Sequence, residues 1–292
     1  MPTGVATNRS NFELPTSVST EILQKTQEQS AIMQLARQIA LPGWGLMIPV
    51  ITSDPEAEWV AETGVKPVKN PGMERKVMQA YKLAVIVPFS NEFRRDASNL
   101  YNALVGRLPL ALAQKFDGTV FHGTAPGSNF DTLANVTAQS LATTASAGAY
   151  DGLVAADMDI AAHDGVLNGF VLSPAGRGEL LSAKDGNDRP LFINSVAEGA
   201  IPMILGQRTY MSKAAYKAGS PNVIGFAGDW TQAMYGIVEG VKVDISEQAT
   251  LTAGTVQNPV TINLWQQNMF AVRAEIEVGF VADTDCFNKL TD

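Results

Sequence analysis

The stretch that decides the fold runs from Ser90 to Gly123 and reads SNEFRRDASNLYNALVGRLPLALAQKFDGTVFHG. Its apolar residues recur three or four positions apart, which is the period of a helix with one face on a core. Asp96 or Ser98 can cap the start of this helix, and Gly123 suits a left-handed residue just past its end. The stretch therefore predicts one long helix, which either spans the molecule as a spine or is an ordinary long core helix. Its core-facing residues are Ala97, Tyr101, Leu104, Leu108, Leu112, Phe116 and Val120.

The clearest strand pattern lies near the other end of the chain, from Phe270 to Phe280. Apolar residues take every second position there, and Arg273, Glu275 and Glu277 lie between them. Period two with charges on one side indicates a strand with one buried and one solvated face. Because helices and strands are mixed without regular alternation, the sequence predicts the α+β class.

Three shorter segments carry local signals. The apolar residues from Ile22 to Ile39 predict a helix that breaks near Ser30. Leu46 to Ile51 is expected to form a strand. Ser173-Pro174 predicts a helix start, because serine caps the first turn and proline misses no hydrogen bond at the first helical position.

Residues 53–87 differ from their surroundings because polar arms flank a tip with two prolines. One expected arm contains Trp59, and the return arm is expected from Lys76 to Val87. A lone two-stranded hairpin is marginal in water, so this one must lie on its own domain or on another chain. An aromatic anchor with a charged rim suits a contact between chains. The candidate intersubunit residues are Trp59, Glu62, Lys66, Lys69, Arg75 and Lys76.

The composition excludes several classes of function. The chain has 292 residues, of which 46% are hydrophobic and 17% charged, as in globular proteins. A net charge of −8 gives no general attraction for phosphate backbones, so nucleic-acid binding is not expected as the main task. The single cysteine, Cys286, excludes a disulfide within the chain. No apolar run is long enough for a membrane span or a signal peptide, so folding in a reducing cytoplasm is the default.

Motifs for cofactors, metals and nucleophilic catalysis are absent: the chain lacks GxxxxGK[ST], GxGxxG, HExxH and GxSxG. We therefore expect no catalytic, cofactor-binding or metal-binding residue. The one acidic cluster that invites a hydrolase hypothesis contains Asp157, Asp159, His163 and Asp164. On a helix Asp159 and His163 would share a face, but such a cluster is more often a solvated surface. His122, beside Gly123, is expected to cap the end of the long helix.

The order of several segments is more specific than any of these motifs. LPTSVSTEILQKTQEQSAIMQLARQI, IPVITSDPEAEWVAETGVKP and YKLAVIVPFSNEFRRDASNL occur in the first third of the chain. FVLSPAGRGELLSAKDGNDRPLF, ILGQRTYMS, GDW and the alternating strand with Arg273 follow. From about Phe12 to Leu290, this order resembles the major capsid proteins of tailed phages of the Hong Kong 97 type.

The resemblance implies subunits that form pentamers and hexamers, closed into an icosahedral shell around double-stranded DNA. It places the protein in the virion capsid, assembled in the bacterial host cytoplasm, with other copies of itself as the main partner. Scaffolding, portal and decoration proteins are further implied partners, DNA contacts are expected to be non-specific, and no membrane is involved. The implied parts are an N-terminal arm (1–27), a peripheral domain (28–51, 88–135 with the spine helix, and 263–292), an extended loop (52–87) and an apical domain (136–262).

Two features depart from the family pattern. Met1 lies close to the matching region, so we expect no cleaved scaffolding segment, and either a separate scaffolding protein or none. Some members also link a lysine of the extended loop to an asparagine on another subunit. Lys66, Lys69 and Lys76 lie in the matching loop and Asn288 lies near the C-terminus, but no motif matches this asparagine to the family.

Two alternatives remain open from the sequence. Bacterial encapsulins share the fold and enclose enzyme cargo instead of DNA. A soluble α+β hydrolase, with the acidic cluster around Asp159 as its site, is the alternative from another class.

Overall fold

The computed structural model describes ten parts of the chain. The expected N-terminal cap Asp96 and the tip residue Lys69 lie outside them. So do most of the N-terminal arm and residues 185–202. The described residues are 25–27, 30–53, 58–60, 66, 68, 72–91, 97–141, 148–184, 203–254 and 259–292.

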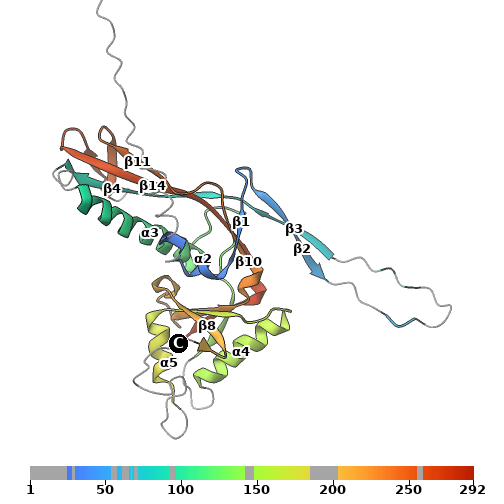
Figure 1. Ribbon diagram of the computed structural model, residues 1–292. Coiled ribbons are helices and arrows are strands. Elements are labelled where there is room, and N and C mark those ends of the chain that lie inside the picture. Colours follow the sequence, from blue (N-terminus) through green and yellow to red (C-terminus); the bar gives the residue numbers. More distant parts are fainter. Residues whose placement is uncertain are drawn as a thin grey trace, which may run out of the picture.

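Two sheets and one long helix make up the body, which confirms the α+β class, and a hairpin projects from it (Figure 1). The five-stranded sheet has the order β1-β10-β14-β11, with β4 on the other edge of β14. Its strands are β1 (Arg37–Ala40), β4 (Tyr81–Ser90), β10 (Ala233–Ile237), β11 (Lys242–Ser246) and β14 (Met269–Ala282).

The six-stranded sheet has the order β5-β15-β9-β6-β8-β7. Residues 136–262 thus supply strands to both sheets, and the last strand of the chain pairs with β9 and β5 of the six-stranded sheet. The strands are β5 (Thr137–Ser140), β6 (Gly169–Leu172), β7 (Met203–Ile204), β8 (Gln207–Met211), β9 (Val223–Gly228) and β15 (Phe287–Thr291).

Two hairpins lie outside these sheets, and the helices pack on the two sheets. The hairpins are β2 (Leu46–Ser53) with β3 (Gly72–Met78), and β12 (Thr250–Gly254) with β13 (Pro259–Asn263). The helices are α2 (Ala31–Leu35), α3 (Ala97–His122), α4 (Ala149–Ala162), α5 (Pro174–Ser182) and the 3-10 turns η2 (Lys213–Ala215), η3 (Trp230–Gln232) and η4 (Thr284–Cys286).

The predicted long helix is confirmed as α3, with 26 residues. Leu108 and Leu112 on its buried side pack against the apolar face of β14, where Ile276 is buried. The charged face of β14 is outward, and Arg273 there donates to Asp244 of β11 at 2.6 Å. The alternation in the sequence therefore identified both the strand and its buried face.

The same helix continues onto the six-stranded sheet. Phe121 of α3 stacks on Phe226 of β9 with ring centroids 4.7 Å apart, and Phe116 packs in the same core. On the opposite face of that sheet α4 and α5 share a second core, which includes Leu153 and Leu180. Because both sheets pack on α3, this helix fixes their relative position.

The sequence prediction was wrong at Gly123. This residue follows α3, but the described glycines with positive φ are Gly45 and Gly206. A Cβ on Gly123 would lie 2.6 Å from the Cα of Thr119, so the small size of glycine is needed for a close approach and not for a left-handed turn.

Helical prediction also failed after Ala36. Ser30 caps α2 by accepting from the Met33 amide, which confirms the predicted break, but the helix ends at Leu35. Arg37–Ala40 is a strand that pairs in parallel with β10. Sheet pairing outweighs the helical spacing of the apolar residues in this segment.

The expected return arm of the hairpin, Lys76 to Val87, is divided between two elements. β3 ends at Met78, and β4 pairs with β14 along ten residue pairs from Tyr81 to Ser90. Alternate residues of β4, such as Val85, pack against the core under α3. The outgoing arm is β2, so the hairpin begins at Leu46, earlier than the sequence predicted.

Asp117 joins three parts of the chain from the middle of α3. Its carboxylate accepts from Ser30 Oγ and from the Ala31 amide at 2.9 Å, and Ser212 Oγ lies 3.4 Å away. The side chain is 1% exposed, and burial raises its pKa to about 6 although these hydrogen bonds favour the charged form. At neutral pH the protein therefore holds a buried carboxylate that ties α2 and the segment before η2 to the long helix.

The raised pKa of Asp117 predicts a pH dependence of subunit stability. The folded protein binds the proton of the Asp117 carboxyl group more tightly than the unfolded chain does. The contribution of this protonation to the free energy of unfolding is therefore fully present below about pH 4 and is lost as pH rises through about 6. The loss is about 3 kcal/mol. Urea denaturation of unassembled subunits between pH 4 and 7 measures it. Asp117→Asn should flatten that part of the curve, and an unchanged slope in the variant would contradict the assignment.

Substitution of Ile276 tests the buried face of β14. Ile276→Asp places an unpaired carboxylate among Leu83, Leu108 and Leu112, at an expected cost of more than about 4 kcal/mol. The matched control on the outward face, Glu275→Gln, should change the free energy of unfolding by less than about 1 kcal/mol. Chemical denaturation measures both, and a stable, soluble Ile276→Asp subunit would show that the face is assigned wrongly.

Candidate intersubunit surface

The two faces of the β2–β3 hairpin have different surroundings. Leu46 and Ile48 pack with Met78 against a small core on the body that also contains Val281. On the other face Met47 and Val77 are direct cross-strand partners, and their side chains are 66% and 36% exposed. A pair of apolar residues on the solvent side of a two-stranded hairpin is a surface without a partner among the described residues.

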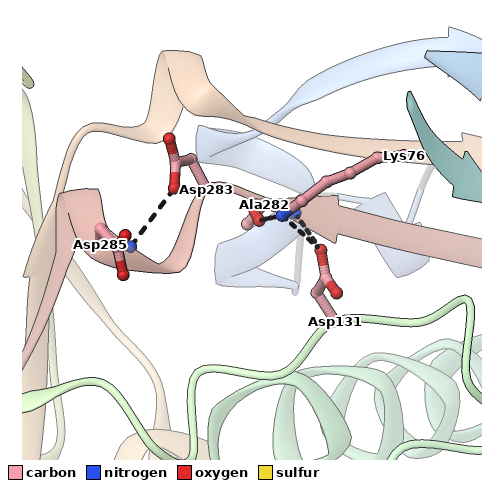
Figure 2. A network of polar contacts seen from close by, with 5 residues as sticks. All are labelled: Lys76, Asp131, Ala282, Asp283 and Asp285. Carbon is pink, nitrogen blue, oxygen red and sulfur yellow. Dashed lines mark hydrogen bonds and ion pairs between the residues drawn. The ribbon is translucent and has the colours of Figure 1, made fainter. Parts of the chain in front are cut away.

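Lys76 fixes the base of the hairpin to the body (Figure 2). Its ammonium donates to the Ala282 carbonyl at 2.8 Å and lies 3.3 Å from Asp131 Oδ2. The same carboxylate oxygen accepts from the Ala282 amide at 3.1 Å, so one carboxylate and one peptide unit hold the ammonium. These bonds attach β3 to the end of β14, and they give Lys76 a role within its own subunit.

The other candidate residues that the structure describes have no such contacts. Trp59 is fully exposed, and Lys66 and Arg75 are exposed. Glu62 and Lys69 lie outside the described residues. Of the four candidate residues that the structure describes, it brings only Lys76 against the body, and contact of the others with a neighbouring subunit stays a prediction.

Sequence reasoning missed part of this surface. Trp44, in the turn before β2, is 89% exposed, and Met47 follows it on the outward face. The signal was present in the run LMIPVI from Leu46 to Ile51, which is apolar at odd and at even positions. A strand with one solvated face should alternate, so an unbroken apolar run predicts cover on both sides.

The residues of the hydrolase hypothesis lie on the outside of α4. Asp157 and His163 are exposed, and the His163 ring lies 2.9 Å from the main-chain oxygen of Asp159, at the end of the helix. Asn288, the asparagine considered for a crosslink, is fully buried and donates to the Ala156 carbonyl at 3.2 Å. It is therefore enclosed under α4 of its own subunit and out of reach of another.

Two further titratable groups, His122 and Cys286, are enclosed by other parts of the subunit, and this burial shifts their pKa values. The His122 ring contacts the Ala215 carbonyl at 3.0 Å, which corrects its prediction as a helix cap, and burial lowers its pKa. Cys286 is buried, and burial first, then nearby aspartates such as Asp283, raise the pKa of its thiol to about 11. The thiol is therefore protonated and unreactive at neutral pH.

Within the described residues, no cluster of His, Cys, Asp and Glu has the size and geometry of a metal site. No helix in that part of the chain combines the length and the apolar character of a membrane span.

Comparison with known proteins identifies the family. Residues 11–291 match the phage capsid family. A probable major capsid protein of Mycobacterium phage D29 is 31% identical over 279 residues, covering 92% of this chain and 86% of its own length. The counterpart in Mycobacterium phage L5 is 30% identical, over 100% of this chain and 93% of its own.

Solved structures agree in fold. A chain of Mycobacterium phage Adephagia superposes with a TM-score of 0.73 at 17% identity, over 100% of this chain and 94% of its own. The capsid of an empty GTA particle, computed with C5 symmetry, superposes with a TM-score of 0.67 at 15% identity, over 100% of this chain and 94% of its own. The resemblance drawn from the order of segments is thereby confirmed, and the chain belongs to the phage capsid family.

Proposed function

We propose that this protein is the major capsid protein of a tailed phage and that it assembles through pentamers and hexamers into an icosahedral shell around double-stranded DNA. Family membership supports the structural role, and two relatives that are 30% identical or more are named as probable major capsid proteins. Assembly takes place in the cytoplasm of the bacterial host. Scaffolding, portal and decoration proteins are the further partners that this role implies.

The observation that carries the proposal is the β2–β3 hairpin. It projects from the body (Figure 1). Its outward face exposes Met47 and Val77, and Trp59, beyond its strands, is fully exposed. A folded chain gains nothing from an apolar surface in water, whereas a neighbouring copy would bury it. The hairpin thus serves as the extended loop by which one subunit holds the next.

The parts of the capsid fold can be assigned to the observed elements. The five-stranded sheet with α3 is the peripheral domain, and the six-stranded sheet with α4 and α5 is the apical domain. The extended loop then spans β2 to β3 and ends at Met78, because β4 belongs to the peripheral sheet. Packaged DNA meets a chain of net charge −8, so its contacts are sparse and non-specific.

Shortening the hairpin tests this function. Ser53 and Gly72 are cross-strand partners, so a short Gly-Ser linker can replace residues 54–71 without moving β2 or β3. The shortened subunit should keep a cooperative thermal transition within a few degrees of wild type. Shell yield should fall roughly tenfold or more, because a buried aromatic anchor typically contributes about 2 kcal/mol or more to an interface. Sedimentation and electron microscopy measure the yield.

Single substitutions supply the control. Trp59→Ala should lower shell yield without changing thermal stability, since the side chain is fully exposed in the subunit. Trp59→Phe keeps an aromatic anchor and should retain most of the yield. Normal shells from the shortened chain would refute the role of the hairpin, and an unfolded shortened chain would place residues 54–71 in the subunit core.

A further inference from the structure

Helix α4 is apolar on two sides. Leu153, Ala156 and Ile160 face the core of the six-stranded sheet. A second stripe points outward at intervals of four residues, where Tyr150 is 51% and Met158 is 68% exposed. Val154 is half-buried and Ala162 is exposed on the same line. A helix that is apolar all round is normally buried, and within the described part of the chain this outward stripe has no cover.

Acidic residues surround the outward stripe. Asp151, Asp157 and Asp164 are exposed, and Asp159 is half-buried with one carboxylate oxygen that has no hydrogen-bond partner. Residues 149–168 contain these four aspartates and no lysine or arginine. The surface formed by this stripe and these aspartates, here called the α4 surface, is therefore apolar in the middle and negative around it.

The opposite edge of the same sheet has the complementary character. α4 packs over β5 and β15 at one edge, and β7 with β8 forms the other edge. Residues 203–223 contain three cations, Arg208, Lys213 and Lys217, all exposed, and no aspartate or glutamate.

Exposed apolar side chains lie among these cations. Met203, Met211 and Tyr216 are 58%, 49% and 43% exposed. Tyr216 and Lys213 line a hollow of about 280 Å³ with Pro174 and Ala175 at the start of α5. The surface formed by these residues and the three cations is here called the basic edge, and its hollow offers a seat for one apolar side chain.

We propose that the α4 surface of one subunit packs on the basic edge of the next copy of the same chain. Contact between two α4 surfaces would bring like charges together, and so would contact between two basic edges. Because the two surfaces differ and lie at opposite edges of one sheet, the contact is head to tail, and repeated contacts of this kind close into a ring. The inference rests on the proposed self-assembly and assigns surfaces to the contacts between apical domains.

The complementary charges identify the partner. A nucleic acid would be repelled by the α4 surface, and a partner for only one surface would leave the other uncovered. A second copy covers both surfaces with one geometry. Opposite charges also steer the copies into register as they meet, and the apolar stripe gains the burial.

Two variants reverse the charge pattern at exposed positions. The α4 variant carries Asp157→Lys and Met158→Lys, and the edge variant carries Arg208→Glu and Lys213→Glu. Asp151 is left unchanged because its carboxylate accepts from the Gly148 amide, and Asp164 is left because its φ of 59° disfavours other side chains. The conservative control, Asp157→Asn with Met158→Leu, keeps the apolar stripe and adds no positive charge.

Each variant alone should keep the thermal stability of wild type and form shells with at least tenfold lower yield, measured by sedimentation. An equimolar mixture of the two variants retains one intact α4 surface and one intact basic edge per pair. It should therefore form hetero-oligomers of two or more copies in native mass spectrometry, which neither variant forms alone. The control should assemble like wild type.

The outcomes separate this inference from the proposed function. If wild type forms shells and either variant does so equally well, the assigned contact is wrong while the capsid function stands. If the mixture gives no hetero-oligomer, the head-to-tail arrangement is wrong. If wild type itself remains a monomer under conditions of assembly, the proposed function and this inference both fail.

Discussion

Burial of one face of β14 against α3 is the constraint on which the rest of the structure depends. β14 is 14 residues long and pairs with β4 on one edge and with β10 and β11 on the other. Its apolar residues are covered by Leu108 and Leu112 of α3, and the far end of the same helix packs on β9. Without this contact neither sheet would have a fixed position relative to the other.

The two sheets held by α3 form a rigid frame that positions the exposed apolar surfaces. The β2–β3 hairpin and α4 leave it from different sheets, and each exposes apolar residues, Met47 and Met158 among them. Both side chains are mostly exposed, so their burial contributes little to the stability of the subunit. Their burial becomes available only on assembly, so the free energy that folds the subunit and the free energy that builds a shell come from separate residues.

The sequence predicted those helices and strands that are specified by the residues within the element itself. Period two identified β14, period 3.6 identified α3, and the Ser173 cap identified the start of α5, where its hydroxyl accepts from the Gly176 amide at 3.1 Å. The sequence-based prediction failed where the secondary structure depends on strand pairing with residues far away in the sequence. Arg37–Ala40 is a strand and not part of a helix, because it pairs with β10. β4 belongs to the five-stranded sheet and not to the hairpin, because it pairs with β14.

The candidate surface could be predicted only in part for the same reason. The proline-rich tip and Trp59 mark a projecting loop, but the ion pair of Lys76 with Asp131 joins residues far apart in sequence. No local pattern specifies that Lys76 turns to its own subunit while Arg75, one residue earlier, is exposed. The alternation of a strand gives this answer once the inner face of β3 is known.

Hydrogen exchange of the backbone amides is the most direct test of the claim that a neighbouring copy supports the hairpin. In unassembled subunits the amides of β2 and β3 should exchange much faster than those of β14, whose core lies within the subunit. In assembled shells the protection of β2 and β3 should rise at least tenfold, while that of β14 stays the same. Equal protection of the hairpin in free subunits and in shells would contradict the account.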